Sequence, residues 1–160
     1  GSPEWVVPIV LVLMGLGMTA GNLVGGHLAD IDLRRTLLFG LAAMAVVFAL
    51  LAFLSFWIVS LAAVVLVVGF VSSVLSPTMQ TRLMDVAGDN QSIAAAMNHS
   101  ALNIGNSLGA FLGGVVIAAG WGFTAPAWTG AALAGAGLLI ALLSYRVEER
   151  RAAATELVAS

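Results

Sequence analysis

The sequence contains no cysteine and no lysine, and charge of either sign is scarce. Without cysteine the chain forms neither a disulfide bond nor a thiolate metal site. Charged residues make up 9% of the chain, against about 25% in soluble domains. The six basic residues form no patch and the net charge is −2, so we expect no nucleic-acid partner. The two histidines, His27 and His99, lie in distant segments, so we expect no metal and no cofactor.

Long apolar runs dominate the chain, which is 61% hydrophobic. From Thr36 to Gln80 no Asp, Glu, Lys or Arg occurs. A spanning helix needs about 20 apolar residues, and one charge at the membrane centre costs about 2.5 to 3.5 kcal/mol. The alternation of polar and apolar residues that is typical of a membrane barrel is not visible. The sequence therefore predicts an all-α integral membrane protein.

The apolar runs and the short polar breaks between them predict five transmembrane helices. The expected spans cover residues 6–29, 36–54, 58–79, 93–119 and 126–145. They form one transmembrane domain, 1–145, followed by a tail, 146–160. Every Arg falls after the first, third or fifth span, so the positive-inside rule makes that side cytoplasmic. We expect a multi-pass protein of the cell (inner) membrane, with the N-terminus outside and the C-terminus inside.

Three of the expected spans carry polar side chains on one helical face. The candidates for lining a substrate path are Thr19, Asn22, Ser73, Ser76, Gln80, His99, Asn103 and Asn106. Gly15 and Gly26 share the face of Thr19 and Asn22. Polar groups in hydrocarbon must face protein or water, so these stripes either join helices together or line a path. The spans 36–54 and 126–145 lack such a stripe, and we expect them to face lipid.

The segment 26–35, which joins the first two spans, resembles the loop motif G-x-L-A-D-R-x-G-R-R of the major facilitator superfamily. The matching positions are Gly26, Leu28, Ala29, Asp30, Arg34 and Arg35. Ile31 and Leu33 stand where the pattern has Arg and Gly. Such departures are typical of the degenerate copy in the C-terminal half of the family. The resemblance implies that Gly26, Asp30, Arg34 and Arg35 belong to a cytoplasmic latch between the two halves.

A second segment, 105–114, resembles the antiporter signature G-x-x-x-G-P-x-x-G-G, with Ala110 in the place of Pro. Together the two segments make the chain similar to helices eight to twelve of a drug:proton antiporter or sugar efflux permease. The implied fold is a partial C-terminal six-helix bundle of the major facilitator fold. The resemblance also implies that four glycines allow close packing against the other half, namely Gly105, Gly109, Gly113 and Gly114.

These observations predict part of a secondary active transporter that exports a small organic solute, drug-like or sugar-like, by proton-coupled alternating access. Its expected partners are the lipid bilayer, a missing N-terminal half, the small-molecule substrate and protons. One alternative is a self-contained five-helix membrane assembly factor or a small channel. Another is an intramembrane hydrolase that uses His99 with Ser100 or Ser107. Ser107 lies two turns from His99 on one helix, too far for a hydrogen bond, so we do not expect an enzyme.

Overall fold

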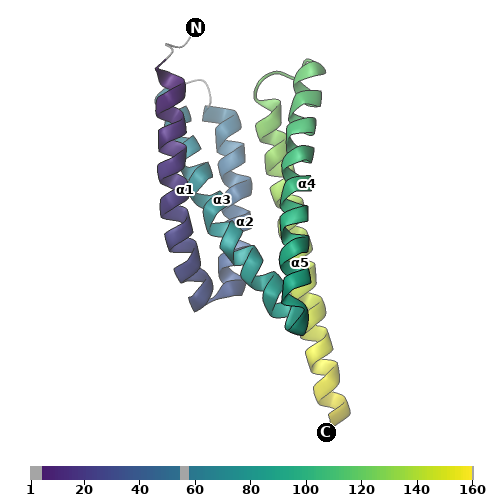
Figure 1. Ribbon diagram of the computed structural model, residues 1–160. Helices are drawn as coiled ribbons and strands as arrows, with labels where there is room; N and C mark the ends of the chain where they lie inside the picture. Colours follow the sequence, from purple (N-terminus) through teal and green to yellow (C-terminus); the bar gives the residue numbers. More distant parts are fainter. Residues whose placement is uncertain (1–4, 55–57, 160) are drawn as a thin grey trace.

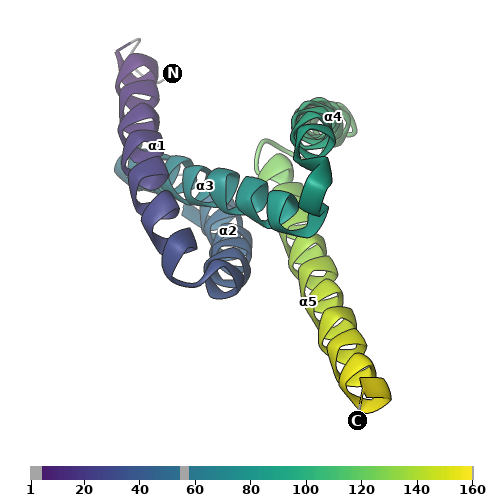
Figure 2. The ribbon, with the colours of Figure 1, turned by 60° about the horizontal axis from the view of Figure 1, so that its bottom comes forward.

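The computed structural model describes residues 5–54 and 58–159, and within these ranges the chain is helical without a strand. The elements are α1 (Val6–Ile31), α2 (Leu33–Leu54), α3 (Ile58–Ala87), the 3₁₀ turn η1 (Gly88–Asn90), α4 (Gln91–Ala118) and α5 (Ala125–Ala159). Figures 1 and 2 show α1, α2 and α3 packed together, with α5 against α2 and with α4 in contact with α3 and α5. The third helix continues past its expected end at Met79, and the fifth continues through the segment expected as a tail.

Successive helices run in opposite directions, and the chain reverses between α3 and α4 at η1 (Figures 1 and 2). Within the described residues, four helical stretches are long and apolar enough to cross a membrane. They are Val6–Ile31, Leu33–Leu54, Val59–Ala118 and Ala125–Thr155. The third stretch contains both α3 and α4, which η1 joins without a non-helical residue. Length and composition therefore support several spans but do not confirm the expected count of five.

The junction between α1 and α2 is much tighter than the sequence motif suggests. The segment 26–35 is the end of α1, one extended residue at Asp32, and the start of α2. The Asp32 carboxylate accepts a hydrogen bond from the backbone N–H of Arg35 at 2.9 Å, which caps α2. The Thr36 hydroxyl lies 2.9 Å from the carbonyl oxygen of Leu28 and 2.8 Å from that of Asp32, so it ties the two helix ends together.

Three glycines let α1 lie directly against the backbone of α3. A Cβ built on Gly17 would lie 2.2 Å from the carbonyl oxygen of Leu66, and one on Gly21 would lie 2.2 Å from that of Phe70. At Gly25 the same atom would meet Val74 Cα at 2.6 Å. Any larger side chain would push the helices apart, so this face of α1 depends on small residues at four-residue spacing.

This contact face differs from the stripe that the sequence suggested for α1. Cβ atoms built on Gly15 and Gly26 meet nothing within 4 Å, and Thr19 and Asn22 are exposed. Glycines occur on both sides of the helix, and periodicity alone does not tell which side meets a neighbour. The α1–α3 contact uses the other side of the helix, which begins at Gly17. The stripe suggested from the sequence did not include this glycine.

The hydrophobic core lies where α2, α3 and α5 meet. Its buried members are Leu37, Leu41, Met44, Val47, Val64, Val71, Leu75 and Tyr145. One face of α2 is therefore covered by protein, although the sequence suggested lipid on this helix. Its other face is open, as at Phe39, which is 74% exposed. Lipid tails are as apolar as Leu, so an apolar helix face does not reveal whether lipid or another helix covers it.

Candidate functional site

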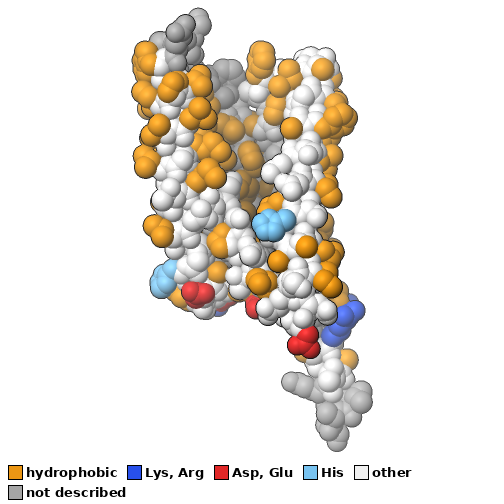
Figure 3. All heavy atoms as spheres, viewed as in Figure 1, with side chains coloured by type: hydrophobic (Ala, Val, Ile, Leu, Met, Phe, Trp, Pro, Cys, Tyr) orange, Lys and Arg blue, Asp and Glu red, His pale blue; other side chains and the backbone are white. Residues whose placement is uncertain are grey.

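All six arginines lie at one end of the bundle, the end from which the C-terminal part of α5 projects (Figure 1). Arg34 and Arg35 begin α2, Arg82 lies near the end of α3, and the others belong to α5. The charged side chains visible in Figure 3 gather at this end, with hydrophobic side chains above them. The bundle is therefore apolar along its length and strongly charged at one end.

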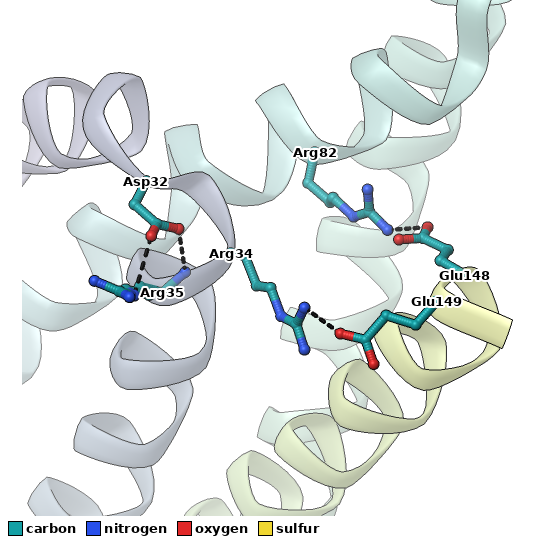
Figure 4. Close-up of polar contacts among 6 residues, drawn as sticks. All are labelled: Asp32, Arg34, Arg35, Arg82, Glu148 and Glu149. Atoms are coloured by element: carbon teal, nitrogen blue, oxygen red, sulfur yellow. Dashed lines mark hydrogen bonds and ion pairs between the residues drawn. The ribbon is translucent and has the colours of Figure 1, made fainter. Parts of the chain in front are cut away.

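Two ion pairs at this end connect α5 to α2 and α3, and Figure 4 shows both. Arg34 Nη1 lies 2.5 Å from Glu149 Oε1, and Arg82 pairs with Glu148. The ring of Tyr145 lies beside both guanidinium groups, with its centroid 4.9 Å from Arg34 Cζ and 4.6 Å from Arg82 Cζ. We call these five residues the ion-pair cluster. It holds three helices together where they reach the charged end.

Tyr145 is the buried centre of the ion-pair cluster, since only 7% of it is exposed. The two guanidinium groups interact with its aromatic ring through cation–π contacts. Its hydroxyl has no hydrogen-bond partner within the described part of the chain. The tyrosine thus contributes through its ring, while the carboxylates of Glu148 and Glu149 hold the arginines in place.

The residues of the expected latch do not all meet in the structure. Arg34 belongs to the ion-pair cluster, whereas the Arg35 guanidinium pairs with Asp32, Nε to Oδ2, at 3.1 Å. Asp30 is exposed and forms no ion pair with the residues that the structure describes. Gly26 faces open space.

The matching positions of the sequence motif do not include the partners of these arginines, namely Asp32, Tyr145, Glu148 and Glu149. A usable signal was present in the sequence. Both glutamates follow the last apolar run, on the side of the membrane where every Arg was expected. Opposite charges at one end of a small bundle meet only where helix packing brings them together, and the sequence does not specify that packing.

The polar face of α4 is open. Every residue from 99 to 111 is exposed, including His99, Asn103 and Asn106. Asn103 lies in a shallow groove on this helix together with Ile104, Ser107, Leu108 and Phe111. Amide groups on a helix this apolar require protein or water opposite them, because hydrocarbon offers no hydrogen bonds.

The remaining path candidates lie in several places. Ser76, Gln80, Thr19 and Asn22 are exposed, and the Thr19 hydroxyl donates to the Gly15 carbonyl of its own helix at 2.9 Å. Ser73 is buried, 4% exposed, one turn after a glycine that packs on α1. Within the described ranges α1 and α4 do not contact each other, so the candidates do not form one closed cavity.

The glycines of the second motif also face outwards. Cβ atoms on Gly105, Gly109 and Gly114 would meet nothing within 4 Å, and one on Gly113 would lie 3.7 Å from Pro126 Cβ. This face of α4 is thus free to receive another segment. Among the described residues, no group of three Cys, His, Asp or Glu side chains is arranged to hold a metal ion.

An α-helical bundle with several membrane-length apolar helices and charge at one end defines an integral membrane protein. Residues 4–159 match the model of the Major Facilitator Superfamily, and the chain therefore belongs to that family.

Curated relatives agree with this assignment. "Inner membrane transport protein YdhP" of Escherichia coli K12 is 36% identical over 140 residues, which cover 88% of this chain and 36% of the relative. "Chloramphenicol resistance protein" of Streptomyces lividans is 30% identical over 141 residues, 88% of this chain and 36% of the relative. "Putative transporter AraJ" of Escherichia coli K12 is 26% identical over 163 residues, 99% of this chain and 41% of the relative. The chain spans well under half the length of these relatives.

Proposed function

We propose that this chain forms most of the C-terminal half of a secondary transporter that exports a small organic solute in exchange for protons. Transport proceeds by alternating access, in which two halves rock about a shared path. The family match and the transporters among the relatives support this proposal. The self-contained assembly factor or channel is not favoured, because the chain matches only about a third of its relatives' length.

The chain crosses the membrane five times in this proposal, as helices eight to twelve of the whole transporter. The reversal at η1 supports it, since α3 and α4 have 30 and 28 residues and each is long enough to span alone. The cluster of all arginines at one end supports a cytoplasmic location for that end. The first residues of α1 then lie outside and the C-terminal part of α5 inside.

The open polar face of α4 is the observation that carries the proposal. Asn103 and Asn106 have no protein opposite them within the described chain, although the helix is apolar enough to lie in the membrane. In the complete transporter this face borders the path, and the glycines at 105, 109 and 114 let the other half approach closely. Thr19, Asn22, Ser76, Gln80 and His99 complete the proposed lining, with Ser73 buried behind it.

The ion-pair cluster acts in this proposal as part of the latch that stabilises one access state. Its arginines and glutamates come from α2, α3 and α5, so their pairing depends on the relative positions of these helices. The group that couples transport to protons lies in the other half of the transporter in this proposal. Within the described spans, His99 on the open face of α4 is the nearest titratable substitute. A carboxylate in the other half meets this need, because no Asp or Glu occurs between Thr36 and Gln80 or on the apolar part of α4.

The test measures efflux of radiolabelled chloramphenicol from cells that express the complete protein, with and without a protonophore. The name of the Streptomyces lividans relative makes this solute the first to try. We expect efflux that stops with the proton gradient and that falls about fivefold in Asn103→Ala, the loss of one hydrogen bond to the solute. Thr129→Ala is the control, since the Thr129 hydroxyl donates to the Ala125 carbonyl of its own helix at 3.0 Å. Equal efflux by Asn103→Ala and wild type would remove Asn103 from the path. Efflux that ignores the gradient would contradict proton coupling.

A further inference from the structure

A crevice of about 420 Å³ opens on the side of the bundle between α1 and α2. It exists because both helices pack mainly on α3 and contact each other little. Its floor is formed by Phe70, Val71 and Val74 of α3, and its lip includes Phe39 of α2. Phe39 is 74% exposed, so the crevice faces whatever surrounds the bundle. This volume lies in the range of small-molecule pockets, about 300 to 1,000 Å³.

The crevice has two chemically different parts. Along α2 its lining changes from Arg35 and Thr36 at the charged end to Gly40 and Ala43 further along the helix. The rise from Arg35 to Ala43 is about 12 Å at the pitch of an α-helix. The small side chain of Ala43 leaves room above the apolar floor. At Gly40 the missing side chain lets Leu75 of α3 pack closely, since a Cβ built there would lie 2.7 Å from Leu75 Cδ2. A ligand that fits has a polar group at the charged end and a slender apolar chain directed towards the middle of the bundle.

Arg35 supplies the polar contact at the mouth. Its Nε and its backbone N–H are both directed to the Asp32 carboxylate, which fixes the side chain (Figure 4). The two terminal nitrogens of the guanidinium form no ion pair with the described residues, and the side chain is 78% exposed. A guanidinium presents its free N–H donors in a geometry that suits a phosphate. Arg34 and Arg82 are not available for this role, because Glu149 and Glu148 occupy them.

We propose that this crevice binds one membrane glycerophospholipid, with its phosphate on Arg35 and one acyl chain over Phe70, Val71 and Val74. The lipid comes from the leaflet at the charged end of the bundle. Basic residues between helices at this level of a membrane are suited to lipid head groups. No residue that lines the crevice belongs to the proposed substrate path, and the site depends only on the membrane location of the chain. It fills the space that α1 and α2 leave over α3.

The test uses the complete protein, purified in detergent and stripped of lipid, with retained ligands counted by native mass spectrometry. Three probes separate the two parts of the ligand: dioleoyl phosphatidylglycerol, dioleoylglycerol without the phosphate, and glycerol phosphate without the chains. We expect retention of phosphatidylglycerol alone. Equal retention of dioleoylglycerol would overturn the role of Arg35, and competition by glycerol phosphate at equal concentration would overturn the role of the crevice.

Two pairs of variants test the residues. Arg35→Gln should retain phosphatidylglycerol about fivefold less, the effect of one arginine at a membrane surface, whereas Arg151→Gln on the exposed part of α5 should change nothing. Ala43→Phe fills the crevice and should abolish retention, whereas Val46→Phe adds the same ring to an exposed position of α2. Wild-type retention in both Arg35→Gln and Ala43→Phe would overturn the proposal.

A photo-crosslinker in place of Phe39 gives a readout that does not require a folded Ala43→Phe. It should label the phospholipid when Arg35 is intact, and the labelling should fall about fivefold when Arg35→Gln is added. Labelling that is unchanged would also overturn the proposal. All these measurements count bound lipid and not transport. A protein that binds the lipid but moves no solute would contradict only the transporter proposal.

Discussion

Substitution of one α1 glycine by alanine should separate the helix face that packs on α3 from the face that does not. The Cβ of Gly21→Ala would lie 2.2 Å from the Phe70 carbonyl oxygen and 3.0 Å from Phe70 Cα. The ordinary carbon–oxygen contact between packed helices is about 3.3 to 3.6 Å. The two helices must therefore move apart by about 1 Å at this level, because backbone atoms of α3 have no rotamer by which to yield.

The expected cost follows from this displacement. Overpacking of a close-packed interface costs about 1 to 3 kcal/mol, and the contacts along the rest of α1 weaken when the helix retreats. Gly15→Ala on the same helix is the matched control, since its Cβ would meet nothing within 4 Å. Alanine favours the helix over glycine by about 0.8 to 1 kcal/mol. The same substitution, six positions apart, should thus destabilise at Gly21 and slightly stabilise at Gly15.

The assay is the free energy of unfolding of the complete protein in mixed micelles, measured by titration with a denaturing detergent and followed by circular dichroism. We expect the two variants to differ by about 1 to 3 kcal/mol, the cost of overpacking at Gly21, because the gain in helix propensity is the same at both positions and cancels. Agreement of the two variants within about 0.5 kcal/mol, the usual effect of a surface substitution, would refute the packing of α1 on α3.

Two further predictions concern the ion-pair cluster. In a double-mutant cycle of Arg34→Ala with Glu149→Ala, the coupling free energy should be about 0.2 to 1 kcal/mol, because the side chains are 47% and 57% exposed; a cycle of Arg35→Ala with Glu149→Ala is the control, and equal coupling in both cycles would contradict the pairing. Tyr145→Phe should leave the free energy of unfolding unchanged or raise it slightly, since the lost hydroxyl has no partner among the described residues. Tyr145→Ala should lower it by about 3 to 5 kcal/mol, and a loss of that size in Tyr145→Phe as well would show that the hydroxyl is bonded.

The sequence was a good guide to what each segment is and a poor guide to which of its faces meets a neighbour. On α1 it indicated small residues at four-residue spacing, but two such rows exist, and the row at 17, 21 and 25 is the one against α3. Similarly, the apolar character of α2 suggested lipid, whereas one face of this helix lies in the core. Periodicity relates the faces of one helix to each other and not to another helix.

The candidate site divides in the same way. The motif around Asp30 and Arg34 can be recognised in the sequence because its residues are adjacent in the chain. Its position between two apolar runs located the charged end of the bundle. Its ion-pair partners are remote, since Arg34 and Glu149 are separated by 115 positions. The pairing of such residues depends on how α5 crosses α2 and α3, and no local pattern records that crossing.

The sequence by itself determined that this protein is helical and lies in a membrane, because hydrocarbon tolerates neither charge nor unpaired backbone groups over such lengths. It also determined that the arginines share one end, because they follow alternate apolar runs. Only the tertiary structure decided which glycines lie on α3, which glutamates hold Arg34 and Arg82, and where α1 and α2 leave a crevice. These features arise from contacts between helices, and the packing of several helices at once, rather than any single segment, selects them.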